Sequence, residues 1–242
     1  MNNLETLKNW IAESRRIVFF GGAGVSTESK IPDFRSDTGI YKKQYPYPAE
    51  TMLSHTFFMN HTGQFYDFYR NVMLYPDAQP NRAHTALASL EQAGKLSCVV
   101  TQNIDGLHQA AGSQLVYELH GSVHRNYCME CGKTYGLDAI TGSTGIPRCS
   151  CGGTIRPDVV LYEEGLDQQT IQGAVSAIRR ADMLIVGGTS LAVYPAAGLI
   201  DYYRGSRLVL INLQSTPYDD RADLCIHDSL GQTLEAAIGG IV

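Results

Sequence analysis

The chain has 242 residues, of which 44% are hydrophobic and 18% are charged. This composition is typical of a folded globular protein and excludes a largely disordered chain. The formal net charge of −5 lacks the basic excess that binds phosphate backbones, so we expect no direct nucleic-acid binding. No apolar run approaches the roughly 20 residues that span a bilayer, and the charged N-terminal segment is unlike a secretory signal. We therefore expect a soluble, cytoplasmic protein with no membrane partner.

Short apolar runs alternate with stretches of helical periodicity along the chain. The expected strands are Ile17–Phe20, Cys98–Thr101, Leu115–Leu119, Met183–Val186, Leu208–Ile211 and Leu224–Ile226. Helical periodicity is clear over Ala83–Ala93 and Gln168–Arg180. Nearly continuous hydrophobicity is typical of strands that are buried on both faces of a parallel sheet. We therefore predict an α/β fold with a doubly wound, mostly parallel, Rossmann-like sheet.

Two stretches interrupt this alternation. Residues 37–81 are rich in Tyr, Phe, Pro and His, and residues 121–156 contain clustered cysteines and several glycines. Strand and helix material flanks both stretches, so we assign them together to a second, smaller domain, a helical insertion plus a cysteine module. Residues 1–36, 82–120 and 157–242 then form the larger domain.

The first expected strand runs into the glycine-rich turn Gly21–Thr27. Glycines let the backbone approach a phosphate closely, and a helix that begins here would present free N–H groups to the anion. The dinucleotide fingerprint G-x-G-x-x-G is met at Gly22 and Gly24, whereas Thr27 replaces the third glycine. Arg35 follows the turn and could pair with a pyrophosphate. A turn without a ligand and a surface arginine stay open as alternatives.

Polar side chains follow two later strands. Gln102, Asn103 and Asp105 come directly after the strand Cys98–Thr101, at the carboxyl end where open α/β sheets bind ligands. An amide and a carboxylate this close suit a flat carboxamide such as nicotinamide, although either residue could instead cap a helix. His120 ends the next expected strand, where a pKa near neutrality suits a general base. A lone histidine is also often structural.

Four cysteines form two close pairs, Cys128 with Cys131 and Cys149 with Cys151. Four thiolates complete the tetrahedral coordination of Zn²⁺ and leave no position for water, which is typical of a structural metal site. The second pair has a single intervening residue where two are commoner, so its local geometry must differ. Disulfides or free thiols are the alternatives.

In their order along the chain, these segments resemble those of the sirtuins, the Sir2 family of NAD⁺-dependent deacylases, in their bacterial type. The matching segments span nearly the whole chain: Gly22–Ser26, Ile31–Arg35, Thr101–His108, His120 with Gly121, the four cysteines, Gly188–Leu191 and Asn212. The resemblance implies an NAD-dependent protein-lysine deacetylase that releases nicotinamide and O-acetyl-ADP-ribose. NAD⁺ would be the co-substrate, zinc would be structural, and the partners would be acetylated lysine-containing proteins or peptides.

The resemblance also implies roles for individual residues. His120 would be the general base on the ribose hydroxyls, Arg35 and Asn103 would position the intermediate, and Asp105 would accept a hydrogen bond from the nicotinamide carboxamide. The residues implied for NAD⁺ binding are Gly22, Ala23, Gly24, Thr27, Ile31, Phe34, Arg35, Gln102, Asn103, Ile104, Asp105, His120, Thr189, Ser190 and Asn212.

The resemblance bears on the substrate as well. Family members that remove succinyl or malonyl groups share a Tyr-x-x-Arg pair, but the position three residues after Tyr66 is Tyr69, and Arg70 falls one residue later on a different helix bearing. We therefore expect a preference for neutral acyl groups such as acetyl. The peptide is expected to lie extended between Val159–Glu163 and Thr189–Tyr194 by β-augmentation.

Three other functions account for part of this pattern. A nicotinamide-dependent dehydrogenase would explain the glycine turn but not the cysteines, and the acidic residue that binds the ribose is missing. A zinc-containing nucleic-acid-binding module conflicts with the net charge of −5. A protein ADP-ribosyltransferase on the same fold is the closest alternative.

Overall fold

The structure is a computed structural model, which describes residues 2–36 and 39–239. Its larger sheet has six strands, all parallel, in the order β3-β2-β1-β7-β8-β9. The strands are β1 (Ile17–Gly21), β2 (Leu96–Thr101), β3 (Val116–Glu118), β7 (Met183–Gly187), β8 (Leu208–Ile211) and β9 (Leu224–Ile226). The predicted doubly wound, mostly parallel sheet is confirmed.

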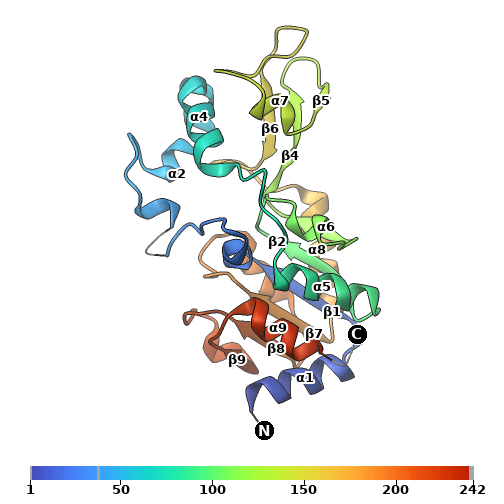
Figure 1. Ribbon diagram of the computed structural model, residues 1–242. Coiled ribbons are helices and arrows are strands. Elements are labelled where there is room, and N and C mark those ends of the chain that lie inside the picture. Colours follow the sequence, from blue (N-terminus) through green and yellow to red (C-terminus); the bar gives the residue numbers. More distant parts are fainter. Residues whose placement is uncertain (1, 37–38, 240–242) are drawn as a thin grey trace.

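Helices cover both faces of this sheet (Figure 1). They are α1 (Asn3–Glu13), α5 (Arg82–Gln92), α6 (Leu107–Ala110), α8 (Gln168–Arg180), α9 (Leu230–Ile238) and the 3₁₀ segments η4 (Ala196–Tyr202) and η5 (Asp219–Arg221). Ile17 and Phe19 of β1 pack in one apolar cluster with α1, α5 and α9, whereas Val18 and Phe20 pack in another with α8 and η4. Burial on both faces is the physical reason why the strands are continuously apolar. None of the helices in the described residues is long and apolar enough to cross a membrane.

The two interrupting stretches form a smaller body, which lies above the larger sheet in Figure 1. It contains an antiparallel sheet in the order β5-β4-β6 and a third apolar cluster that includes Phe58, Phe65 and Ile155. Its elements are η2 (Ile40–Lys42), α2 (Ala49–Met52), α3 (His55–Asn60), α4 (Thr62–Phe68), the π-helical segment η3 (Tyr69–Met73), β4 (Gly121–Cys128), β5 (Thr134–Tyr135), α7 (Asp138–Thr141) and β6 (Ile155–Val159). Residues 37–38, where we expect the first stretch to begin, lie outside the described residues.

Two glycine turns meet where the strand order reverses, between β1 and β7. The Gly24 N–H donates to the Gly188 carbonyl at 2.8 Å, and a Cβ on Gly24 would lie 2.8 Å from the Gly188 Cα. Gly188 itself has a φ of +61°, a backbone conformation that glycine adopts at no steric cost. Glycines therefore let the two turns pack against each other at the topological switch point, where doubly wound sheets bind ligands.

Candidate active site

A cavity of about 840 Å³ opens at the carboxyl ends of the central strands and extends to the smaller body. It brings together every residue that the resemblance implies for catalysis or NAD⁺ binding: Gly22, Ala23, Gly24, Thr27, Ile31, Phe34, Arg35, Gln102, Asn103, Ile104, Asp105, His120, Thr189, Ser190 and Asn212. Leu53, Val72 and Leu137 of the smaller body also line it. The roles of these residues stay predictions, but the shared cavity is a prerequisite for them.

The turn after β1 forms the 3₁₀ segment η1 (Ala23–Ser29) rather than the start of an α-helix. The Thr27 hydroxyl donates to the Gly24 carbonyl at 3.0 Å, which closes the turn on itself. The N–H of Gly24 is used by Gly188, so it is not one of the free donors that a helix N-terminus would offer an anion. This difference follows from the contact between the two glycine turns.

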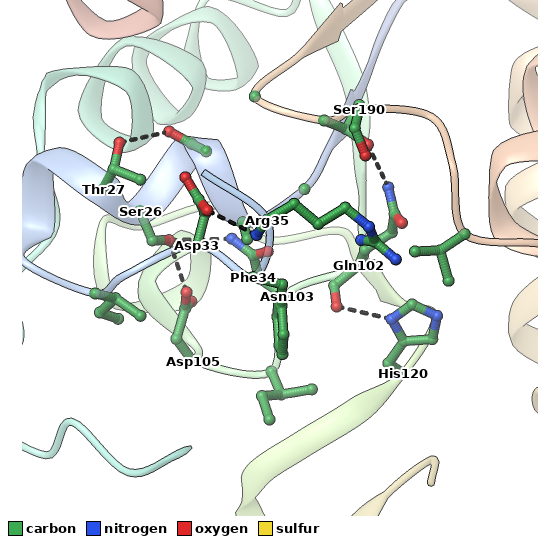
Figure 2. Close-up of a pocket in the computed structure, with 18 of the residues that line it drawn as sticks. Ser26, Thr27, Asp33, Phe34, Arg35, Gln102, Asn103, Asp105, His120 and Ser190 are labelled. Atoms are coloured by element: carbon green, nitrogen blue, oxygen red, sulfur yellow. Dashed lines mark hydrogen bonds between the residues drawn. The ribbon is translucent and has the colours of Figure 1, made fainter. Parts of the chain in front are cut away.

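Ser26 connects the amide and the carboxylate that follow β2 (Figure 2). Its hydroxyl donates to Asp105 Oδ2 at 2.7 Å and accepts from Asn103 Nδ2 at 3.0 Å. The other carboxylate oxygen of Asp105 accepts from the Leu107 N–H at 2.9 Å, at the start of α6. This is an Asx-type turn and not the helix cap considered from the sequence, because Gly106 is the N-cap of α6 and no side chain caps it; Asp105 still lines the cavity.

His120 has one ring nitrogen fixed by the backbone. Its Nδ1 lies 2.9 Å from the Gln102 carbonyl oxygen. A carbonyl can only accept, so Nδ1 carries the proton and Nε2 keeps its lone pair. Burial lowers the pKa of His120 below its ordinary value, and the ring is therefore neutral near pH 7. A neutral imidazole with a free Nε2 in a cavity is suited to accept a proton.

Phe34 and Arg35 follow η1 and contact the same aromatic ring. The rings of Phe34 and Tyr41 are 5.4 Å apart, and the Arg35 guanidinium carbon lies 5.3 Å from the centre of the Tyr41 ring. In Figure 2 the exposed Arg35 side chain extends across the cavity towards the side where Gln102 and His120 lie. A cation in this position is available to an anionic ligand.

Asn212 supplies a test of whether the cavity fits a nucleotide. Its Oδ1 accepts from the Thr189 N–H at 2.9 Å, but its buried Nδ2 has no partner among the described residues. A buried donor without an acceptor is costly, so its presence in a ligand cavity points to a ligand that accepts hydrogen bonds. A ribose hydroxyl of NAD⁺ fits this requirement.

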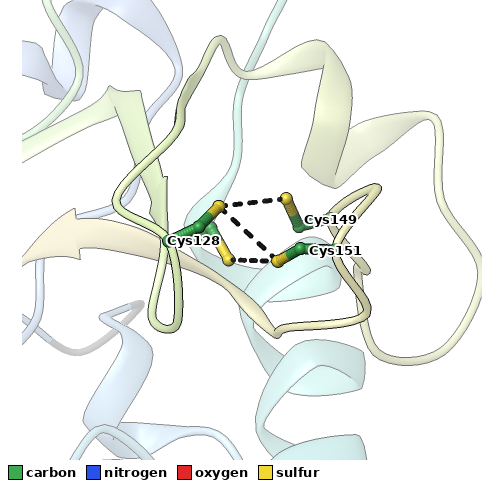
Figure 3. A group of neighbouring side chains, drawn as sticks. Cys128, Cys149 and Cys151 are labelled. Carbon is green, nitrogen blue, oxygen red and sulfur yellow. Dashed lines mark hydrogen bonds between the residues drawn. The ribbon is translucent and has the colours of Figure 1, made fainter.

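The four predicted metal ligands converge in the smaller body (Figure 3). Their Sγ atoms all lie within 4.8 Å of one another, with Cys128 and Cys151 at 3.5 Å and Cys131 and Cys149 at 3.6 Å. A Zn–S bond of about 2.3 Å in a tetrahedron implies sulfur separations of about 3.8 Å. The Cys151 backbone N–H and the Tyr135 hydroxyl lower the pKa of the Cys149 thiol, whereas hydrogen bonds to the other three thiols raise the pKa of Cys151. The arrangement fits a closed, structural Zn²⁺ site.

The cavity side chains that the sequence did not predict include Ser26 and His124, and Tyr162 was expected only as part of the peptide segment 159–163. The His124 Nε2–H donates to the Asp105 carbonyl at 3.0 Å, and the Tyr162 hydroxyl is hydrogen-bonded to that of Tyr41. Ser26 lies in the segment Gly22–Ser26 that resembles the sirtuins, and its position directly after the glycine-rich turn could have indicated a place in the cavity. His124 reaches the cavity from β4 of the smaller body and Tyr162 from the segment that follows β6, and no local sequence pattern predicts either contact.

The sheet, the crevice at its switch point and the cysteine cluster define a dinucleotide-binding α/β protein with an added zinc module. The chain belongs to the Sir2 family, which it matches over residues 22–195. It is 61% identical over 242 residues to the NAD-dependent protein deacetylase of Clostridium acetobutylicum, covering 98% of this chain and 99% of that one. The predicted resemblance to a bacterial sirtuin is confirmed.

Solved structures of Sir2 proteins share the whole fold. A Sir2 complex with deacetylated p53 peptide and 3'-O-acetyl ADP ribose has a TM-score of 0.90 and 39% identity, and covers 98% of each chain. A complex of Sir2, p53 peptide and NAD⁺ has a TM-score of 0.87 and 40% identity, and covers 100% of each. At these identities the agreement extends beyond a shared fold to a shared family.

Proposed function

We propose that this cavity deacetylates protein lysine residues, with His120, Asn103, Asp105 and Arg35 in the roles that the resemblance implies. The chain is an NAD-dependent protein deacetylase with a structural zinc, and transfer of ADP-ribose to protein is the less favoured alternative. The observation that carries the residue assignment is convergence: an amide, a carboxylate and an imidazole from separate segments line one cavity.

The chemistry divides between the co-substrate and the side chains. When bound, NAD⁺ supplies a glycosidic bond whose cleavage releases nicotinamide and leaves a ribose that accepts the acyl group. His120 Nε2 accepts a proton from a ribose hydroxyl, because Nδ1 is already committed to Gln102. Asp105 accepts from the carboxamide N–H with lone pairs not used by Ser26 and Leu107. Arg35 stabilises negative charge on the phosphate side.

The substrate would bind across the mouth of the same cavity. We propose that an acetylated peptide lies extended between residues 159–163 and 189–194, both of which contribute lining residues. Acylated peptides are bound by related Sir2 structures, including a propionylated one. Because such pairing contacts mainly the peptide backbone, we expect the enzyme to select substrates by the acyl-lysine and not by the neighbouring side chains.

We predict that neutral acyl groups are preferred over acidic ones. The Tyr66 hydroxyl is hydrogen-bonded to the Ile155 carbonyl, and Arg70 donates to the carbonyls of Ile140 and Gly145. Neither side chain lines the cavity, so this arginine does not reach an acyl carboxylate. Paired acetyl- and succinyl-peptides should show a higher kcat/KM for deacetylation. Faster desuccinylation would contradict the prediction.

The decisive experiment is one incubation with NAD⁺ and an acetyl-lysine peptide, followed by mass spectrometry of all products. Deacetylated peptide, nicotinamide and O-acetyl-ADP-ribose should appear in equal amounts. The variant His120→Ala should lose about 10²- to 10⁴-fold in rate, as expected on removal of a general base, while retaining its circular dichroism spectrum. Label from NAD⁺ that remains on protein would instead support ADP-ribosyl transfer, and reduced nicotinamide would support a dehydrogenase.

We also propose the domain boundaries, a cytoplasmic location and the absence of direct nucleic-acid binding. Separate apolar clusters support domain boundaries near residues 36, 81 and 120, whereas the proposed boundary after 156 falls inside β6, whose Val159 packs in the third cluster; limited proteolysis would test all four. A cytoplasmic location rests on the presence of NAD⁺ there and would be tested by cell fractionation. The absence of direct nucleic-acid binding rests on the net charge of −5 and would be tested by titration with DNA at low salt.

A further inference from the structure

Two tyrosine hydroxyls join the loop after η1 to the segment after β6. Tyr41 belongs to η2, and Tyr162 lies shortly beyond the end of β6. Their hydroxyl groups are hydrogen-bonded to each other although the residues are 121 positions apart in the sequence. Both residues line the cavity. The pair therefore links the side of the cavity assigned to NAD⁺ with the side assigned to the peptide.

Tyr41 is attached to the loop that carries Phe34 and Arg35. Its backbone N–H donates to the Phe34 carbonyl at 2.9 Å, and the N–H of Ile40 donates to the Asp33 carbonyl at 2.9 Å. Its ring contacts the Phe34 ring and lies under the Arg35 guanidinium group. A shift of Tyr41 would therefore move both of the cavity residues it contacts.

Tyr162 is held on the opposite side. Its N–H donates to the Leu53 carbonyl and its carbonyl accepts from the His55 N–H, both at 3.0 Å. The next residue, Glu163, accepts from the Thr56 N–H at 2.8 Å. These bonds fix the backbone of the segment along which the acyl-peptide would lie, while the exposed Tyr162 side chain reaches across to Tyr41.

We propose that the Tyr41–Tyr162 hydroxyl pair is a positioning bridge that couples peptide binding to the placement of Phe34 and Arg35 at the NAD⁺ site. The inference rests on the proposed function, because it assigns the two sides of the cavity to NAD⁺ and peptide. A peptide that lies along the segment after β6 restricts the exposed Tyr162 side chain, and Tyr162 in turn holds Tyr41 through the hydroxyl pair. Coupling of this kind is reciprocal, so a ligand at the NAD⁺ site must strengthen peptide binding by the same factor.

The chemistry of the pair permits such a role over the working pH range. Burial raises the pKa of the Tyr41 hydroxyl above its ordinary value, so the group stays protonated and able to donate. A hydrogen bond between two neutral groups contributes about 0.5–1.5 kcal/mol, which corresponds to roughly two- to tenfold in a binding constant. The expected coupling therefore has a measurable size.

The test removes only the hydroxyl groups. Calorimetry would measure the affinity for ADP-ribose, an unreactive probe of the NAD⁺ site, with and without saturating acetyl-lysine peptide. In the unmodified protein the peptide should strengthen ADP-ribose binding. In Tyr41→Phe and in Tyr162→Phe this enhancement should fall by roughly two- to tenfold, and the double variant should lose no more than either single one.

A matched control makes the same tyrosine-to-phenylalanine substitution elsewhere in the smaller body. Tyr47 packs its ring against Phe57 and His61, contacts that phenylalanine keeps, so Tyr47→Phe should retain the full enhancement. The same enhancement in Tyr162→Phe as in the unmodified protein, or additive losses in the double variant, would overturn the bridge. If the unmodified protein deacetylates the peptide, such a result contradicts only the proposed Tyr41–Tyr162 bridge. If the unmodified protein neither deacetylates the peptide nor binds ADP-ribose, the result contradicts the proposed function itself.

Discussion

At the residue scale, the carbonyl of Gln102 determines which nitrogen of His120 can accept a proton. Because that carbonyl holds the Nδ1–H at 2.9 Å, the basic nitrogen is Nε2. Protein surroundings often fix the tautomer of a catalytic histidine in this way. If His120 is the general base proposed above, the Gln102 backbone carbonyl prepares it for that role, and substitution of the Gln102 side chain would leave this contact in place.

The pH dependence of deacetylation should follow from the same histidine. Burial lowers the pKa of His120 below 6.5, so the neutral, basic form persists to lower pH than for an exposed histidine. As pH falls through the lowered pKa, protonation blocks Nε2 and kcat/KM should decline. We expect the acid limb of the kcat/KM profile to lie below pH 6.5. An acid limb above that value would contradict the assignment.

Ser26 should matter as much as the two residues it connects. Ser26→Ala removes the donor to the Asp105 carboxylate and the acceptor for Asn103. A hydrogen bond to a charged group contributes about 1.5–3 kcal/mol, so kcat/KM for NAD⁺ should fall roughly tenfold or more. The control Ser113→Ala changes a buried hydroxyl that has no partner among the described residues and lies outside the cavity lining. Equal effects of both substitutions would argue against a specific role for Ser26.

Individual site residues were predictable when they lay in a local motif at a strand end. Gly22, Asn103, Asp105 and His120 follow strands whose carboxyl ends meet at one edge of the sheet, so topology alone brings them together. His124 was not predictable, because its contact with the Asp105 carbonyl comes from the part of β4 between Ser122 and Asn126 where the pairing with β6 is irregular. Contacts across the two bodies leave no period or spacing in the sequence.

At the scale of elements, the strands of the larger sheet and the helices α5 and α8 were predicted well, whereas the strands of the smaller sheet, α9 and the short helices were not predicted. The helix α8 matches its expected bounds, and β8 and β9 do as well. Helices such as α2 and α3 are too short to show a periodicity. The antiparallel pairing of β4 with β6 was also not predicted, because it joins strands far apart in the sequence. Gly121, with a φ of +77°, lets the two strands approach closely, since a Cβ there would meet the Asp158 carbonyl oxygen.

The zinc module should fail as an element when one ligand is lost. Cys128→Ser removes a thiolate from a closed site that contributes folding energy, so the protein should lose zinc and the smaller body should unfold. Metal analysis and limited proteolysis would measure both effects. Cys225→Ser, at a cysteine outside the cluster, should keep a full equivalent of zinc. Retention of zinc by Cys128→Ser would contradict four-thiolate coordination.

At the scale of the whole molecule, the cavity makes the two bodies depend on each other. Its lining includes Gly24 and Asn212 from the larger body and Leu53 and Tyr41 from the smaller one. A ligand that spans these residues binds only when both bodies are folded and placed correctly. Binding should therefore stabilise the entire chain rather than one part of it.

ADP-ribose should raise the melting temperature of the protein as a consequence. At a free concentration about 100 times its dissociation constant, a ligand that binds only the folded state adds about 2.7 kcal/mol. For a chain of this size each kcal/mol raises Tm by about 2–4 °C, so the shift should be roughly 5–10 °C. Differential scanning calorimetry would measure it, with the dissociation constant taken from titration. Since the cavity lining joins both bodies, all of the unfolding heat should move together. A shift confined to one of two resolved transitions would mean that the ligand site belongs to a single body.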